Sequence, residues 1–343
     1  MSAGSIAYTL VPSPEHAFPG HPESPERFRF FDRLQTGELS EHLRAIPARP
    51  AAEDAITSVH TMGHLQAIRE AARQGPRFVD YGDTYVAPSS CEAALLAAGG
   101  TIAMLEAILA GDVDKGFALV RPPGHHATQN QAMGFCLFNN IAIATRQALR
   151  SGCARVMIVD FDVHHGNGTQ DIFYEDGDVL YVSTHQRGIY PGSGYAREVG
   201  AGSGEGTTIN IALPSGAGDR AFQMAIEQVI LPVGERFKPD LLLISAGFDA
   251  HWCDPLAGLQ LSTSGYYEIA SRLRALAEKV CGGRMLFTLE GGYDPRGLAE
   301  NVGAVLRACA GLAPGPDQLG PAPRDEPDIG PLISEIRSIH SLS

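Results

Sequence analysis

The chain contains few cysteines, and their spacing argues against two common structural roles. They number six in 343 residues, and no two of them form a Cys-x-x-Cys pair. The positions are Cys91, Cys136, Cys153, Cys253, Cys281 and Cys309. Such scattered thiols argue against a disulfide scaffold and against a structural zinc held by cysteines. Reduced cysteines are typical of the cytoplasm, and we therefore expect a cytoplasmic protein.

Long apolar runs and clusters of positive charge are missing as well. No apolar run approaches the ~18 residues of a membrane span, and no charged leader precedes an apolar stretch, so neither a membrane segment nor a signal peptide is expected. Aspartate and glutamate outnumber lysine and arginine by 39 to 26, which gives a net charge of −13. Without a basic cluster, direct binding to nucleic acid phosphates is not expected. A cationic substrate fits this charge, and so does a surface that is acidic for solubility alone.

Short apolar segments alternate with longer helical patterns along most of the chain. The composition, 44% hydrophobic and 19% charged, is that of an ordinary globular protein. The expected strands are Ile6–Val11, Gly116–Val120, Arg155–Phe161, Val179–Thr184, Leu241–Ala246 and Arg284–Glu290. The expected helices are Ser89–Ala110, Asn140–Arg150, Ala221–Phe237, Ser264–Val280 and Gly297–Ala310. This alternation predicts a mostly parallel sheet with helices on both faces.

The length fits about two domains or one large α/β domain. We find no internal repeat, and we expect one main domain over residues 1–312 and a linker with a tail over residues 313–343. The linker, 313–330, is rich in Pro, Gly and Asp. Weak helical periodicity over Leu332–Ile339 predicts a segment that docks on the body or on a neighbouring chain. Near the start, the Pro-shaped loop His21–Arg27 is expected to enter a helix over Glu26–Leu34.

Four polar motifs follow the expected strands. They are Arg121-Pro-Pro-Gly-His-His126, Asp160–Asn167, Ser245–Asp249 and Glu290–Tyr293. Ligands of parallel α/β sheets bind at the carboxyl ends of the strands, so these motifs are expected to meet on one edge. Their agreement carries more weight than any one motif.

A metal site is the first chemistry that these motifs predict. Asp162 and His164 come from one strand end and start on the same face, and Asp249 follows another buried strand. Each alone is more often a turn cap than a ligand. Together they supply three ligands and leave a fourth position open, as in catalytic zinc sites. Such a metal would acidify a bound water and polarise a carbonyl.

Two adjacent histidines are suited to proton transfer. His125 and His126 could divide the work of a base towards water and an acid towards a leaving amine. Asp160 and Asn167, beside the metal ligands, are suitable partners to fix their tautomers. The alternative is an ordinary surface histidine pair in a loop.

Three aromatic residues have plausible roles around the metal. Tyr293, after two glycines, could stabilise an oxyanion, although a tyrosine there is usually turn geometry and packing. Gly134-Phe135 and Tyr190–Gly192 could wall a narrow tube for a long alkyl side chain. The alternative for these loops is ordinary packing.

These motifs resemble the histone deacetylase family. R-P-P-G-H-H, G-F-C-x-F-N-N, D-x-D-V-H-H-G-N-G-T-Q, S-A-G-F-D-A…D-P-L and L-E-G-G-Y occur in this order between about His21 and about Ala310. Asn167, followed by Gly-Thr-Gln, is similar to class II enzymes and to bacterial deacetylase-like amidohydrolases and acetylpolyamine amidohydrolases. The resemblance implies an arginase/deacetylase fold, a three-layer α/β/α sandwich around a mostly parallel eight-stranded sheet. The domain 1–312 would then be deacetylase-like.

The resemblance also implies a role for each site residue. It makes Asp162, His164 and Asp249 the ligands of one Zn²⁺. The implied catalytic residues are His126 with its partner Asn167, His125 with its partner Asp160, and the oxyanion donor Tyr293. The implied substrate contacts are the Gly134 carbonyl, the walls Phe135 and Tyr190, and Leu256 at the rim. Arg27 resembles an arginine that lines an inner channel for acetate release.

Family members also carry a potassium ion behind the zinc. The implied ligands are Asp160, Asp162, His164, Ser183 and Thr184. The related arginase branch uses two manganese ions and other Asp-rich motifs. Here His165-Gly166-Asn167 stands where a second metal would require a carboxylate, so one catalytic metal is expected.

The predicted function is zinc-dependent hydrolysis of the amide of an acylated amine such as acetyl-lysine. One alternative is the same chemistry on small molecules, such as acetylpolyamines or xenobiotic anilides. Leu256 is apolar and no long insertion precedes Gly116, which favours the acyl-lysine type. A non-catalytic binding module would be expected to lack a ligand or the tyrosine, and all are present. A homo-oligomer is compatible with the sequence.

Overall fold

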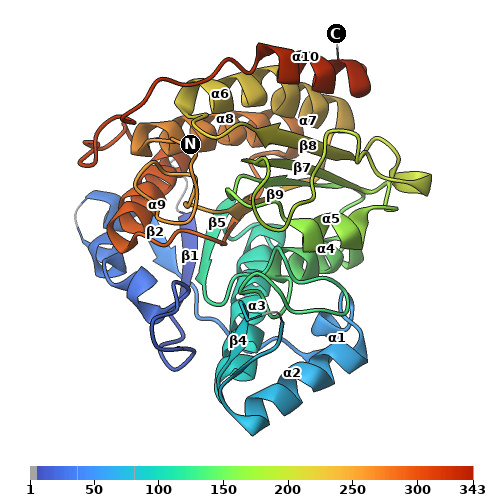
Figure 1. Cartoon of the computed structure of the whole chain (residues 1–343), viewed down its shortest axis with the longest axis vertical. Coiled ribbons are helices and arrows are strands. Elements are labelled where there is room, and N and C mark those ends of the chain that lie inside the picture. Colours follow the sequence, from blue (N-terminus) through green and yellow to red (C-terminus); the bar gives the residue numbers. More distant parts are fainter. Residues whose placement is uncertain (1–5, 37, 81, 343) are drawn as a thin grey trace.

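The structure is a computed structural model that describes residues 6–36, 38–80 and 82–342. Eight strands form one sheet in the order β2-β1-β5-β10-β9-β6-β7-β8 (Figure 1). Their bounds are β1 Ile6–Val11, β2 Leu43–Ala45, β5 Lys115–Val120, β6 Val156–Asp160, β7 Val179–Gln186, β8 Thr208–Leu213, β9 Leu241–Ala246 and β10 Met285–Leu289. All neighbouring strands in this sheet are parallel. A separate antiparallel pair joins β3 (Arg77–Phe78) to β4 (Tyr85–Val86).

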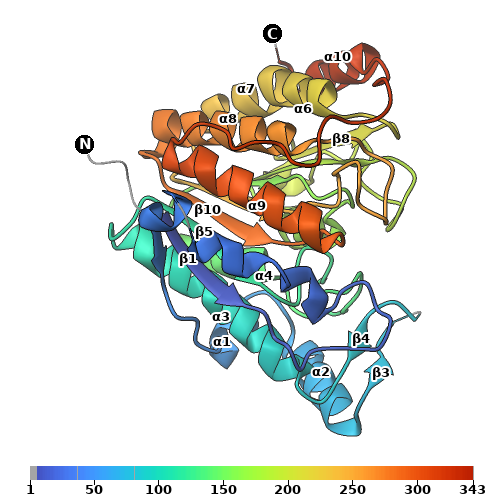
Figure 2. The ribbon, with the colours of Figure 1, turned by 90° about the vertical axis from the view of Figure 1, so that its left-hand side faces the viewer.

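Helices cover both faces of the sheet (Figure 2). The α-helices are α1 Glu53–Ile56, α2 Met62–Gln74, α3 Ser90–Leu109, α4 Asn140–Arg150, α5 Asn167–Phe173, α6 Asp219–Ala225, α7 Leu231–Phe237, α8 Thr263–Cys281, α9 Pro295–Ala310 and α10 Gly330–Ile339. Short 3₁₀ turns span Pro25–Phe28, Phe31–Gln35, Glu38–His42 and Gly202–Gly204, and a π turn over Ile226–Ile230 joins α6 to α7. One apolar core lies under α6, α8 and α9, and the other under α2, α3 and α4.

The core explains why the central strands read as continuous apolar runs. Every residue of β6 and β9 is buried, because helices cover the sheet on both sides. Strands β5, β10, β9 and β6 lie side by side in the middle of the sheet. Their carboxyl ends carry the four polar motifs, so the topology gathers these motifs on one edge as the sequence predicts.

The structure confirms the expected strands and most of the expected helices to within two residues at their ends. An exception is Glu26–Leu34, which is wrong as a single helix. Two 3₁₀ turns stand there instead. The buried side chains Phe28, Phe31 and Leu34 recur every three residues. Phe31 and Leu34 lie in the second turn, and their three-residue spacing is that at which side chains of a 3₁₀ helix lie on one line.

Two helices, α10 and α3, pack against the body of the protein. The predicted tail helix is α10, which packs on β8 and on the π turn of the same chain and buries Ile333 and Ile336. Helix α3 is long and apolar enough to cross a membrane by length and composition. However, 61% of its most apolar window is buried inside the protein, as in a core helix. All six cysteines are free.

Candidate metal centre

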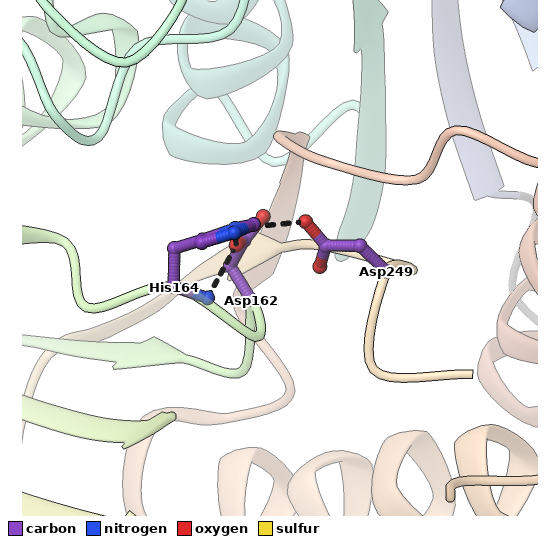
Figure 3. Close-up of side chains that lie close together, drawn as sticks. All are labelled: Asp162, His164 and Asp249. Carbon is purple, nitrogen blue, oxygen red and sulfur yellow. Dashed lines mark hydrogen bonds and ion pairs between the residues drawn. The ribbon is translucent and has the colours of Figure 1, made fainter. Parts of the chain in front are cut away.

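Two carboxylates and an imidazole meet at the carboxyl ends of β6 and β9 (Figure 3). Asp162 and His164 follow β6, and Asp249 follows β9. Asp162 Oδ1 and Asp249 Oδ2 each lie 3.2 Å from Nδ1 of His164. One ligand atom from each residue lies within 4.8 Å of the other two. The structure thus brings the three predicted zinc ligands together around one point.

Glycines beside the ligands let neighbouring turns approach the carboxylates closely. A Cβ at Gly247 would lie 2.1 Å from Asp162 Oδ2, and one at Gly291 would lie 2.1 Å from Asp249 Oδ2. The Gly291 N–H donates to Asp162 Oδ2 at 2.7 Å, and the Val163 N–H donates to Asp249 Oδ1 at 3.0 Å. The backbone therefore fixes both carboxylates, and a side chain at either glycine would displace them.

The charges of this cluster suit a divalent cation. Asp162 and Asp249 are each only 1% exposed. Burial and the nearby Asp162 raise the pKa of the Asp249 carboxyl above its usual value. Burial opposes a charged imidazole at His164, but its hydrogen bonds to the two carboxylates outweigh burial and raise its pKa to about 10. A cation bound here would relieve the repulsion and replace that proton, so the donor set fits the predicted zinc.

His126 lies beside the predicted ligands and is neutral, which is the protonation state that a general base requires. Its Nδ1 is 2.8 Å from Oδ1 of Asn167, which accepts the Nδ1 proton and leaves Nε2 free to take one. Burial and the charges of His125 and His164 hold the pKa of His126 well below its usual value. Its ring centre is 6.0 Å from that of His164. A neutral imidazole is therefore held next to the metal position.

His125 has the opposite charge state. Its ring centre is 4.0 Å from that of His126, and its Nδ1 lies 3.0 Å from Oδ2 of Asp160. Burial disfavours a cation here, but Asp160, Asp162 and Glu290 outweigh burial and raise the pKa of His125 to about 10. The adjacent histidines therefore differ, since His125 carries a charge that His126 lacks. The Asp160 and Asn167 partnerships predicted from the sequence are both present.

Tyr293 follows β10 and stands in front of Arg27. The Arg27 side chain is 1% exposed, donates from Nε to the Gly292 carbonyl at 2.7 Å, and places its guanidinium carbon 4.9 Å from the Tyr293 ring centre. Burial raises the pKa of Tyr293 well above its usual value; Arg27 opposes this, and Asp249 and Asp162 add to it. The phenol is thus a permanent hydrogen-bond donor near neutral pH. The structure places Arg27 behind this phenol, and its role in an acetate channel stays a prediction.

Aromatic rings and a glycine line the approach to the histidines. Gly134 has a φ of 55°, and a Cβ there would lie 2.3 Å from Cδ2 of His126. The Tyr190 ring stands nearly perpendicular to that of His126 at 5.1 Å. On the other side, the Phe135 ring packs edge-on at 5.7 Å from Tyr293. The predicted walls therefore flank the catalytic candidates.

Two residues predicted at the entrance, Tyr190 and Leu256, are partly exposed, and two carboxylates lie near Tyr190. Tyr190 and Leu256 are each 38% exposed. Burial and the charges of Asp83 and Asp80 raise the pKa of the Tyr190 phenol above its usual value. Burial and Asp80 raise the pKa of the Asp83 carboxyl in turn. The sequence did not single out these two carboxylates, because their position depends on the β3–β4 loop.

The residues expected to hold potassium are neighbours at the ends of β6 and β7, and two of them are also predicted metal ligands. Ser183 pairs with Asp160 in the register of β6 and β7. The Thr184 hydroxyl donates to the Asp160 carbonyl at 3.4 Å. Asp162 and His164 follow in the same turn, and the Asp162 N–H donates to Asp160 Oδ1 at 3.2 Å. The five residues are neighbours, and a potassium ion among them stays a prediction.

Three buried ionisable residues lie next to the site, and the sequence had predicted no role for them. Glu290 is fully buried, and its Oε2 accepts from the N–H groups of Gly124 at 2.7 Å and His125 at 3.1 Å. Burial raises the pKa of Glu290 to about 7. Arg121 and Glu23 form a buried ion pair at 2.6 Å. Two of these, Arg121 and Glu290, directly follow apolar strands, and that position is the sequence feature by which they could have been predicted.

Comparison with known proteins agrees with this geometry. A model of the histone deacetylase domain matches residues 21–309. The chain is 45% identical over 324 residues to the chloroplastic histone deacetylase 10 of Oryza sativa subsp. japonica, covering 89% of this chain and 73% of the relative. It is 41% identical over 319 residues to the histone deacetylase-like amidohydrolase of Pseudomonas aeruginosa, covering 91% and 83%.

A solved structure shows the same architecture. The crystal structure of the HDA15 HD domain superposes with a TM-score of 0.88 at 36% sequence identity. The match covers 99% of this chain and 95% of that one. The parallel eight-stranded sheet with helices on both faces is therefore the arginase/deacetylase fold predicted from the sequence.

Proposed function

Because this chain belongs to the histone deacetylase family, we propose that it is a zinc-dependent amidohydrolase that removes acyl groups from amines such as acetyl-lysine. The observation that carries the proposal is the Asp162–His164–Asp249 cluster with a neutral histidine beside it. Relatives named deacetylase and amidohydrolase support hydrolysis of an acylated substrate. Zinc, when bound, supplies Lewis acidity to a carbonyl oxygen and to water.

His126 is the proposed proton carrier of the reaction. Its Nε2 takes a proton from the attacking water and later gives it to the leaving amine. Asn167 Oδ1 holds the Nδ1 proton, so the ring presents the same nitrogen in both steps. His125, held charged by Asp160, supports the negative charge that develops during the attack. A fixed cation in a buried site stabilises such charge without reorganisation.

Tyr293 is the proposed oxyanion donor. Its phenol stays protonated because burial and the ligand carboxylates raise its pKa. A hydrogen bond from this hydroxyl becomes stronger as the carbonyl oxygen gains charge, which lowers the barrier. Loss of one such donor typically costs about 10²–10³ in kcat.

The rim supports a second substrate class. A lining of Phe135, Tyr190 and Leu256, as predicted from the sequence, would suit an alkyl chain such as that of acetyl-lysine. The carboxylates Asp80 and Asp83 act on the Tyr190 phenol, so negative charge stands close to the entrance. That charge favours a cationic substrate such as an acetylpolyamine.

We also propose a potassium ion held by the Asp160–His164 turn with Ser183 and Thr184, and a cytoplasmic location.

A turnover panel tests the proposal. Zinc-loaded protein should release acetate from an acetyl-lysine peptide, with an acetylpolyamine and a simple anilide compared under the same conditions. Tyr293→Phe and His126→Ala should each lose at least about 100-fold in kcat while keeping stoichiometric zinc. Tyr195→Phe is the matched control, because Tyr195 is 60% exposed and outside the proposed machinery. Full activity in either site variant would refute the mechanism.

A further inference from the structure

The carboxylate of Asp254 connects the loop of a metal ligand to the backbone of Tyr293. Asp254 lies five residues after Asp249 and is 8% exposed. Its Oδ2 accepts from the Tyr293 N–H at 2.6 Å and from the Asp294 N–H at 3.3 Å. Its Oδ1 accepts from the Leu256 N–H at 3.0 Å. One side chain therefore holds the oxyanion donor, the rim and the ligand loop together.

We propose that Asp254 is a positioning residue for Tyr293, an inference that rests on the proposed function. The carboxylate fixes the Tyr293 amide and thereby the direction of its Cα–Cβ bond, so the phenol faces the metal position. The hydrogen bond to Leu256 two residues on is an ordinary turn cap. By contrast, the bond to Tyr293 spans 39 residues and is not required by the turn.

Asp254 and Arg27 hold the turn that carries Tyr293 from different sides. Arg27 holds the other side through the Gly292 carbonyl at 2.7 Å. The Asp254 loop is itself anchored, because Trp252 donates from Nε1 to the Gly320 carbonyl at 3.1 Å and from its N–H to Leu261 at 3.0 Å. The turn is thus gripped from two directions. A misplacement of about 1 Å at a catalytic group can cost about 100-fold in rate.

The kinetic test is a double-mutant cycle with Tyr293→Phe. Asp254→Ala should lower kcat by about 10–100-fold at stoichiometric zinc, with a smaller change in KM, because Asp254 acts on catalysis through the backbone of Tyr293. In the Tyr293→Phe background the same change should cost less than about threefold, since the positioned hydroxyl is already absent. An equal loss in both backgrounds would overturn the inference. Asp294→Asn is the control, because Asp294 caps α9 through Gly297 and does not hold Tyr293.

A spectroscopic measurement separates this inference from the proposed function. In protein labelled with 3-fluorotyrosine, the Tyr293 resonance is assigned by its loss in Tyr293→Phe. Asp254→Ala should shift or broaden that resonance and Asp294→Asn should not, whether or not the protein hydrolyses amides. An unchanged resonance would overturn the inference. Asp254→Asn keeps one oxygen acceptor and the side-chain volume, and it serves as the test variant if the alanine variant fails to fold.

Discussion

Buried carboxylates hold the catalytic candidates in place by accepting backbone N–H groups. Glu290 grips the N–H groups of Gly124 and His125, and Asp254 grips that of Tyr293. A carboxylate that accepts such bonds in a buried site imposes a geometry that an apolar residue could not. The cost is desolvation, which raises the pKa of both acids to about 7. The free energy of unfolding should therefore depend on pH, because these buried acids titrate near neutral pH.

Glu290→Gln should change that pH dependence in a defined direction. The native pKa of about 7 lies above the usual 4.5, so the folded protein binds the extra proton between these values. The contribution of Glu290 to the free energy of unfolding is then fully present below about pH 4.5, and it is lost as pH rises through about 7. The unfolding free energy of wild type minus that of the variant should fall by about 3 kcal/mol across this window. Denaturant unfolding of metal-free protein measures it.

The matched control for this prediction is Ser245→Ala. It removes the hydroxyl that donates to Glu290 Oε1 at 3.1 Å but leaves the carboxyl in place. Its difference from wild type should change with pH much less than that of Glu290→Gln, because the titrating carboxyl remains. A pH-independent difference for Glu290→Gln would contradict the assigned pKa.

Among the elements, the tail helix α10 belongs to the folded body. It packs on β8, the edge strand of the sheet, and on the π turn between α6 and α7 (Figure 1). Before it, Glu326 accepts from the N–H groups of Gly218, Arg220 and Ala221 at the start of α6, each at 2.9 Å. The segment after residue 312 therefore supplies a helix cap and covers a sheet edge, two stabilising roles far from the chemistry.

Removing one buried side chain of α10 tests this role. Ile336→Ala should lower the free energy of unfolding by about 2–5 kcal/mol, because the fully buried side chain leaves a cavity. Amide turnover should change less than twofold, since α10 lies outside the site. Glu335→Ala is the control at an exposed neighbouring position. Denaturant titration of both variants decides, and a loss below about 1 kcal/mol would show that the helix is only loosely docked.

The elements found from the sequence are those with a clear pattern. The alternation was predicted from long apolar strands and amphipathic helices. Strand β8 was missed because Thr208 and Asn210 interrupt its apolar pattern, although every residue of the strand is buried. The family motifs fall at strand ends, so parallel topology alone brought the ligands and histidines together. The contacts of Glu290 and Asp254 were not foreseen, because the N–H group that a carboxylate accepts depends on loop conformation rather than on spacing.

For the whole molecule, the candidate metal centre brings residues from distant parts of the chain to one point. A cation that binds the folded state but not the unfolded chain stabilises the fold by mass action. At free zinc 100 times above Kd, the expected gain is about 2.7 kcal/mol, seen as a higher melting temperature. Asp249→Ala should abolish this gain, and Asp325→Ala, an exposed acidic control, should keep it. An equal zinc response in the Asp249 variant would place the metal elsewhere.

The position of β10 has a consequence for synthesis on the ribosome. It is the last strand in the chain, yet it lies between β5 and β9 and is hydrogen-bonded to both. Until residue 289 has emerged, the strands β2-β1-β5 and the strands β9-β6-β7-β8 share no hydrogen-bonded neighbour. Half-sheets that form before then have open inner edges, which are prone to association with other chains. Arrival of β10 closes that gap and brings Tyr293 together with the histidines that follow β5 and the predicted ligands that follow β6 and β9.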